Sequence, residues 1–233
     1  SSAASFGNAI HNTLERVHTH MRTHESLMPE EDILSEFERQ LGAYALTDDE
    51  WEHFLKKGQD ALHIFLSERS DTFNPNQIAE RNFSNQDVTL DTARLKGKLD
   101  VLEIDKQTKT AKVIDYKTGK PLEVWGKGSD YDKMKAHHYR QQLLFYKLLI
   151  ENSRDYHAYT MTDGALQFVE PNDAGHTVLL PLGNVDQEEF DRFKRLVGVV
   201  WQHINDLSFP DTSQYDPTVD GIKQFEDDLL TKS

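Results

Sequence analysis

The sequence predicts an α+β protein built on one mixed sheet, and three observations support this prediction. Apolar residues recur at helical spacing through about the first 70 residues. After the breaker segment 71–76, alternating apolar and polar residues indicate short strands. From there to about residue 207, strand-like and helix-like segments succeed one another, and this order favours a sheet flanked by helices.

Three helices are expected before the sheet. The first is indicated by apolar residues three or four positions apart, namely Phe6, Ile10, Leu14, Val17 and Met21. Pro29, followed by two acidic residues, begins a second helix, since proline and acids both favour a first helical turn. Thr47 and Glu50 have the spacing of a capping box, which predicts a third helix that continues to about Arg69.

Strands and two longer helices are expected after residue 76. The predicted strands, in order, are 78–83, 88–90, 95–104, 111–116, 156–161 and 176–182. The polar turn 105–109 joins the two strongest of them. Helices are expected at about 132–151, after a glycine-rich loop, and at 186–207, before Pro210.

This order of elements predicts a single domain over residues 1–209. Its helical part covers 1–72 and its sheet-containing core covers 76–209. The acidic residues 210–233 are expected to form a C-terminal arm, which either docks through a short helix at 222–230 or links to another segment.

Composition excludes several classes of protein. Hydrophobic residues make up 37% and charged residues 28% of the 233 residues, which is typical of a soluble globular chain. No apolar run approaches the roughly 20 residues of a membrane helix, so we expect no membrane partner. The absence of cysteine excludes disulfides and iron–sulfur clusters and is typical of a cytoplasmic protein. The N-terminus has neither an initiating Met nor a signal-peptide pattern, so we expect a domain of a longer polypeptide.

The net charge of −14 is distributed unevenly. Residues 94–147 contain 13 Lys and Arg against 7 Asp and Glu, whereas the rest of the chain contains 13 against 33. A basic middle third can hold a polyanion locally while the acidic remainder weakens non-specific binding. The same lysines are also compatible with ordinary solvated surfaces.

The residues with the clearest chemical potential lie on the predicted hairpin. Side chains alternate along a strand, so Asp115 and Lys117 face the same side. If the turn is centred near residues 107–108, Asp100 lies opposite Asp115. Two opposed carboxylates repel unless a cation lies between them, and a hard divalent cation is the natural candidate. Lys117 would then stand beside the metal, where it can orient or deprotonate a water or hold a phosphate oxygen.

Each of these residues also has an ordinary structural interpretation. Asp100, Asp115, Lys98 and Lys117 are compatible with an exposed patch of weak ion pairs. On the helix after the sheet, Gln142 and Tyr146 share a face, where spacing alone predicts a core aromatic residue and a boundary residue. His11, at the edge of the apolar face of the first helix, is likewise compatible with a boundary position.

Four segments follow one another in the chain: Phe6-Gly7-x-x-Ile10-His11-x-x-Leu14, Gly97-x-Leu99-Asp100, Ile114-Asp115-Tyr116-Lys117-Thr118-Gly119 and Gln142-Leu143-x-x-Tyr146. In this order and spacing, over about residues 6–152, they resemble the RecB-like branch of the PD-(D/E)XK nucleases. The resemblance implies a restriction-endonuclease-like αβββαβ core with extra N-terminal helices. It also implies a position at the C-terminal end of a UvrD-type superfamily 1 helicase, with the ATPase region upstream.

The resemblance also implies roles for individual residues. The metal ligands would be His11, Asp100, Asp115 and the backbone carbonyl of Tyr116, and they would bind Mg²⁺ or Mn²⁺. Lys117 would be the catalytic lysine, and Gln142 and Tyr146 would orient the site and the DNA backbone. Glu80 falls where the family often has a glutamate, and we assign it a supporting role only.

The implied activity is metal-dependent hydrolysis of DNA, acting on single strands or duplex ends during repair or recombination. Cations that border the proposed site are candidates for backbone phosphate contacts: Lys96, Lys98, Lys120, Lys127, Lys133, Lys135 and Arg140. The iron–sulfur cluster of cysteine-bearing relatives is excluded here. Two other functions stay open, a catalytically silent DNA-binding or scaffold module and a regulatory protein-interaction domain.

Overall fold

The computed structural model describes residues 1–231, and their chain folds into two compact units. The first unit contains Ser1–Arg81, Lys98–Glu123 and Thr162–Pro181. The second contains Asn82–Gly97, Val124–Met161 and the chain from Leu182 onward. Within residues 1–231, no helix combines the length and the apolar character that crossing a bilayer requires.

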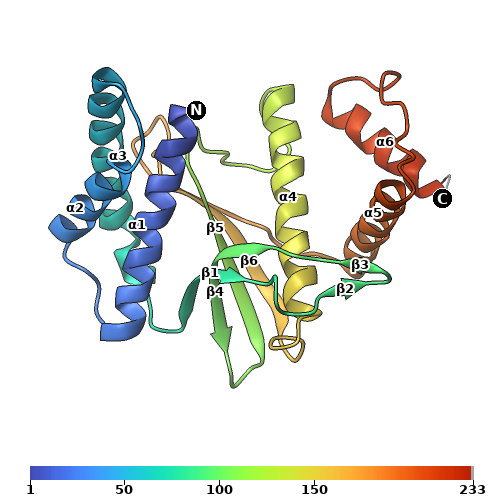
Figure 1. Ribbon diagram of the computed structural model, residues 1–233, viewed down its shortest axis with the longest axis horizontal. Helices are drawn as coiled ribbons and strands as arrows, with labels where there is room; N and C mark the ends of the chain where they lie inside the picture. Colours follow the sequence, from blue (N-terminus) through green and yellow to red (C-terminus); the bar gives the residue numbers. More distant parts are fainter. Residues whose placement is uncertain (232–233) are drawn as a thin grey trace. The chain divides into compact units, whose positions relative to one another are not determined.

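The first unit begins with the three expected helices, α1 (Ser2–His24), α2 (Glu30–Leu41) and α3 (Asp48–Arg69), which lie side by side in Figure 1. The predicted capping box is present at the start of α3, where Thr47 and Glu50 hydrogen-bond each other reciprocally. A short 3₁₀ turn, η1 (Ser70–Thr72), follows α3. The buried faces of the helices form one hydrophobic core with Val101 and Tyr116 of the sheet.

The central sheet has five strands in the order β1-β4-β5-β6-β7. These strands are β1 (Gln77–Asn82), β4 (Lys98–Asp105), β5 (Thr110–Lys117), β6 (Thr160–Phe168) and β7 (Val178–Pro181). Strands β4 and β5 are antiparallel and pair from Val101↔Ile114 to Asp105↔Thr110, which is the predicted register. The mixed sheet confirms the predicted α+β fold class.

The second unit contains three helices and a small hairpin. The hairpin pairs β2 (Thr89–Leu90) with β3 (Ala93–Arg94), and the helices are α4 (Asp130–Glu151), α5 (Gln187–Asn205) and α6 (Val219–Thr231). Leu144 and Leu148 of α4 pack against Phe190 and Phe193 of α5. Helix α6 covers the expected C-terminal helix and packs on both α4 and α5.

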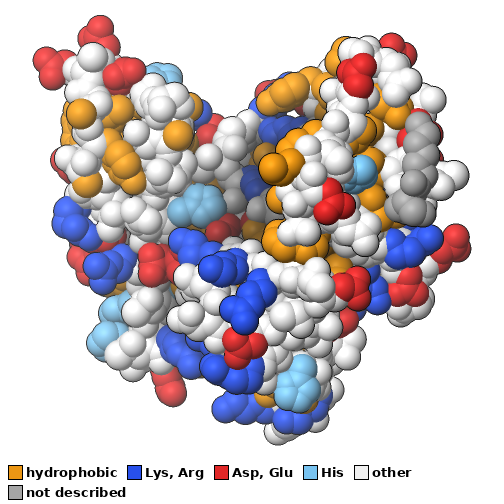
Figure 2. All heavy atoms as spheres, turned by 45° about the vertical axis from the view of Figure 1, so that its right-hand side comes forward, with side chains coloured by type: hydrophobic (Ala, Val, Ile, Leu, Met, Phe, Trp, Pro, Cys, Tyr) orange, Lys and Arg blue, Asp and Glu red, His pale blue; other side chains and the backbone are white. Residues whose placement is uncertain are grey.

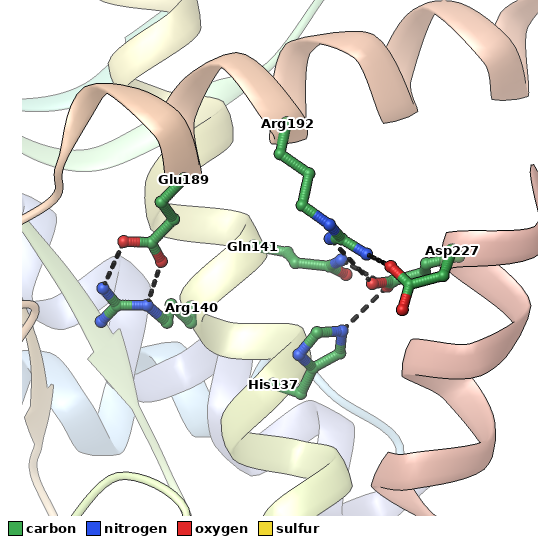
Figure 3. A network of polar contacts seen from close by, with 7 residues as sticks. His137, Arg140, Gln141, Glu189, Arg192 and Asp227 are labelled. Atoms are coloured by element: carbon green, nitrogen blue, oxygen red, sulfur yellow. Dashed lines mark hydrogen bonds and ion pairs between the residues drawn. The ribbon is translucent and has the colours of Figure 1, made fainter. Parts of the chain in front are cut away.

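A buried carboxylate fastens α6 to its neighbours. Glu226 is 6% exposed and accepts hydrogen bonds from His137 Nε2 at 2.8 Å and from Gln141 Nε2 at 2.6 Å. Arg192 of α5 lies 3.5 Å from Glu226 and 2.6 Å from Asp227. Figure 3 shows the side chains of α4 and α5 converging on α6 in this network.

Two strand predictions need correction. The strand predicted at 156–161 is wrong, because residues up to about 158 form turns in which His157 donates to the carbonyl of Ser153 and Tyr159 to that of Tyr156. Strand β6 begins only at Thr160 and continues to Phe168. The strand predicted at 95–104 begins only at Lys98, because residue 95 still belongs with the β2–β3 hairpin, where the Leu95 N–H donates to the carbonyl of Val88.

Candidate active site

The β4–β5 hairpin carries two aspartates at the same level of the sheet. Extending the observed pairing by one residue beyond Val101↔Ile114 places Asp100 opposite Asp115. Asp100 Oδ2 accepts a hydrogen bond of 2.8 Å from the backbone N–H of Tyr116, which fixes its carboxylate against β5. Asp115 is only 2% exposed, and a carboxylate so deeply buried needs a positive partner.

Lys117 supplies one positive charge to this pair. Its Nζ lies 2.6 Å from Asp115 Oδ2, and its side chain is 15% exposed. The two residues are separated by one position on β5, so their side chains project from the same face of the strand. This arrangement places a partly accessible ammonium group directly beside a buried carboxylate.

The first helix brings His11 to the aspartates. His11 Nδ1 lies 3.5 Å from Asp100 Oδ1. Burial lowers the pKa of His11, but the hydrogen bond to Asp100 and the negative charges of Asp100, Asp115 and Glu80 outweigh it, so the pKa is raised above 6.5. The negative surroundings therefore favour a cation at this position.

A third carboxylate reaches the same place from β1. Ligand atoms of His11, Glu80 and Asp100 lie within 4.8 Å of one another. Glu80 has a φ of 52°, an unusual conformation for a non-glycine residue in a strand, and it forms an ion pair with Lys98. The family resemblance assigns Glu80 only a supporting role, whereas the structure groups it with His11 and Asp100. Its positive φ has no signature in the residue types around it.

These donors fit a hard divalent cation. Carboxylate and carbonyl oxygens are the protein ligands that suit Mg²⁺ and Mn²⁺. The buried Asp115 and the clustered oxygens of Glu80 and Asp100 are the observation that supports the fit. The backbone carbonyl of Tyr116, between Asp115 and Lys117, is an additional oxygen on the same strand.

The turn after Lys117 is held from several sides. The Lys117 carbonyl accepts from the N–H of Val169 at 3.0 Å, and the Gly119 N–H donates to Glu170 at 2.6 Å. Lys57 of α3 lies 2.8 Å from the same Glu170 carboxylate. Gly119 has a φ of 94°, which favours glycine. The end of β5, and with it Lys117, is therefore rigidly placed.

Helix α1 approaches this turn closely at one residue. A Cβ at Gly7 would lie 3.1 Å from Thr118 Oγ1, so the absence of a side chain lets the start of the helix reach the end of β5. One turn later the same helix presents His11.

The remaining predicted residues are distributed over both units. Gln142 and Tyr146 lie one turn apart on α4 in the second unit, where Gln142 Nε2 donates to Tyr146 Oη at 2.7 Å. The second unit also carries Lys96, Lys127, Lys133, Lys135 and Arg140, and the first carries Lys98 and Lys120.

Several of the candidate phosphate-binding cations are already engaged: Lys133 lies 3.8 Å from Asp130, and Lys98 and Arg140 have closer partners. Lys98 pairs with Glu80. The Arg140 guanidinium contacts both carboxylate oxygens of Glu189, at 2.5 and 2.8 Å, and donates to the carbonyl of Leu182 at 2.9 Å. Both pairs reduce the charge that these residues can offer to a phosphate.

Comparison with known proteins agrees with this geometry. The sequence matches the family model of the PD-(D/E)XK nuclease superfamily over residues 1–216, which includes His11, Glu80, Asp100, Asp115 and Lys117. The comparison with curated proteins gave no significant match. The family match covers most of the chain and the whole of the metal-fitting cluster, and we conclude that this chain belongs to the PD-(D/E)XK nuclease superfamily.

Proposed function

We propose that this chain is a DNA nuclease domain that hydrolyses phosphodiester bonds with Mg²⁺ or Mn²⁺. The observation that carries the proposal is the grouping of His11, Glu80 and Asp100 beside the Asp115–Lys117 pair. The burial of Asp115 argues against an exposed patch of weak ion pairs. Carboxylates grouped with a histidine and a lysine, with one carboxylate withdrawn from solvent, suit metal-assisted hydrolysis.

In this proposal, His11, Asp100, Asp115 and the Tyr116 carbonyl hold the cation, and Glu80 is a further candidate ligand. A bound Mg²⁺ or Mn²⁺ would lower the pKa of water and neutralise charge on the phosphate. Lys117 Nζ, held beside Asp115, orients the attacking water or a non-bridging phosphate oxygen. The water oxygen forms a bond to phosphorus while the bond to the 3′ oxygen breaks. The water gives up one proton and the departing 3′ oxygen gains one, which leaves a 5′-phosphate on the other product.

We further propose that the chain belongs to the RecB-like branch and acts at the C-terminal end of a superfamily 1 helicase, in the cytoplasm, during repair or recombination. The order of its four motifs supports this assignment, including Gln142 and Tyr146 one turn apart on α4. The substrate would be single-stranded DNA or duplex ends, with the helicase region upstream in the same polypeptide.

A cleavage assay tests the activity. Labelled single-stranded and duplex DNA would be incubated with the protein in Mg²⁺ or Mn²⁺, with EDTA as the metal-free control. Lys117→Ala should abolish cutting, whereas Lys112→Ala, an exposed lysine on the same strand, should retain it. Cutting that survives EDTA, or that Lys117→Ala leaves unchanged, would contradict the proposed mechanism.

Metal binding by the same proteins separates the nuclease from a silent module. Titration with Mn²⁺ should show a site that Asp100→Asn weakens strongly, because Asp100 contacts both His11 and β5. A folded protein that binds neither Mn²⁺ nor Mg²⁺ and does not cut DNA would favour the scaffold function instead.

A further inference from the structure

The second unit has a basic cavity that the proposed nuclease mechanism does not use. It has a volume of about 490 Å³ and is lined by the segment that leads into β2, by β3 and the residues after it, and by Arg154. Three of its lining residues are cations, Arg94, Lys96 and Arg154, whereas Asp87 is the one acidic residue among them. Figure 2 shows Lys and Arg side chains gathered over the lower part of the face that it draws.

The cations of this cavity, which we call the Arg94 pocket, are accessible. Arg94 and Lys96 are separated by one position after the β2–β3 turn and are both exposed, while Ala93 of β3 is buried. Within the described residues 1–231, neither Arg94 nor Lys96 forms an ion pair. Arg154 pairs with Asp155 at a well-exposed site, where such a pair contributes little.

The walls of the Arg94 pocket are fixed by a buried glutamine. Gln86 is 4% exposed, donates to Asp155 Oδ2 at 2.8 Å and accepts from the Asp155 N–H at 3.1 Å. The Gln86 carbonyl accepts from the Arg154 N–H at 2.9 Å. On the other wall, the Leu95 N–H donates to the carbonyl of Val88 at 2.9 Å. The cations are therefore presented from a preorganised frame, which lowers the entropy cost of binding.

We propose that the Arg94 pocket binds phosphates of the DNA backbone. The inference rests on the proposed function, since it names a second place where the substrate is held. Two unpaired cations and a weakly paired arginine match the charge of neighbouring phosphodiesters, and Ser84, Asn85 and Thr89 offer neutral hydrogen-bond donors. None of the nine lining residues, all within the described chain, is aromatic, so we expect binding to phosphate rather than stacking on bases.

Binding of labelled single-stranded DNA in EDTA tests the Arg94 pocket without cleavage. Arg94→Gln/Lys96→Gln should weaken binding at least tenfold. It should also reduce the slope of log affinity against log salt by about 1.4, which is about 0.7 for each phosphate that is no longer neutralised. The matched control is Lys106→Gln/Lys112→Gln, which removes the same charge from the exposed surface of the β4–β5 hairpin. It should change the affinity less than twofold.

Several outcomes would contradict phosphate binding by the Arg94 pocket. Equal losses in the two double variants would show a general charge effect, and undetectable DNA binding by the unaltered protein at low salt would remove the basis of the proposal. Strands with and without a 5′-phosphate should bind alike, since binding that requires the terminal phosphate would contradict recognition of the backbone. As a control, both double variants should keep the circular dichroism spectrum and the Mn²⁺ affinity of the unaltered protein. This result would show that the fold and the candidate metal site are intact.

The test distinguishes this inference from the proposed nuclease. If the Arg94→Gln/Lys96→Gln variant loses DNA affinity while even the unaltered protein fails to cut with Mn²⁺, the proposed phosphate binding is supported and the proposed nuclease activity is contradicted. If the unaltered protein cuts and this variant binds DNA with undiminished affinity, the proposed phosphate binding is contradicted and the nuclease activity is supported.

Discussion

The histidine behind the candidate site should make the stability of the first unit depend on pH. His18 is 3% exposed, its Nε2 lies 2.8 Å from Tyr116 Oη, and its ring centroid lies 4.6 Å from that of Phe73. Burial lowers the pKa of His18 to about 4, although Gln77 and Asp100 oppose that shift. The folded protein therefore holds a neutral imidazole beneath the strand that carries Asp115 and Lys117.

The magnitude follows from the two pKa values. In the unfolded chain His18 has a pKa of 6.5, so it binds a proton there at a pH where the folded protein does not. Its contribution to stability is complete above pH 6.5 and is lost as the pH falls from 6.5 to about 4. The loss is about 2 kcal/mol at about pH 5 and about 3 kcal/mol below pH 4, from 1.36 kcal/mol for each pKa unit.

Urea unfolding at about pH 7.5 and about pH 5 measures this loss. The comparison protein is His18→Gln, which keeps a hydrogen-bonding group for Tyr116 but cannot titrate. The drop in unfolding free energy between the two pH values should be about 2 kcal/mol smaller in the variant. The raised pKa of His11 gives the opposite pH dependence, since its contribution to stability is lost as the pH rises. His11 is present in both proteins, so its contribution cancels in the comparison. Equal pH dependence in the two proteins would refute the reasoning.

Three further predictions concern packing and positioning. Gly58→Ala should destabilise the chain by about 1–2 kcal/mol despite its gain in helix propensity, because its Cβ would lie 2.1 Å from Cζ of the fully buried Phe37. Denaturant unfolding measures that cost, and adding Phe37→Leu should recover part of it. Glu226→Ala should destabilise the docking of α6 by about 2 kcal/mol, since His137, Gln141 and Arg192 lose their acceptor; undiminished hydrogen-exchange protection in α6 would argue against this. Glu170→Ala should lower kcat on DNA about tenfold and leave Mn²⁺ affinity unchanged, because it frees the turn after Lys117. Glu170→Gln, which keeps an acceptor for Gly119, should retain most of the activity.

The parts of the fold that the sequence predicts well are those fixed by local rules. The β4–β5 register follows from the position of the polar turn, and it matches the observed pairing of Val101 with Ile114. The alternation of side chains along β5 then places Asp115 and Lys117 on one face, where they form an ion pair. The helices before the sheet are equally local, since the capping box at Thr47 and the apolar spacing of α1 determine them.

The parts that the sequence does not reveal depend on contacts between distant segments. Glu80 joins the ligand cluster from β1 with a positive φ, and neither feature is indicated by the residue types around it. Residues 156–158 resemble a strand in composition, but the hydrogen bond from His157 to Ser153 closes a turn there. In the sequence, Glu226 cannot be told apart from the other acidic residues of the C-terminal stretch. In the structure it is buried against α4 and α5.

The number of Lys and Arg residues in the basic stretch 94–147 overstates the positive charge that is available to a phosphate. The excess of Lys and Arg over residues 94–147 includes Arg140 and Lys98, whose charges are held by Glu189 and Glu80. An incoming phosphate would have to compete with those carboxylates, so these residues add less to affinity than their number suggests. Arg94 and Lys96 lie in the same basic stretch without such partners in the described chain. If the Arg94 pocket holds DNA as proposed, the affinity of this acidic protein for DNA depends on where its unpaired cations lie rather than on its net charge.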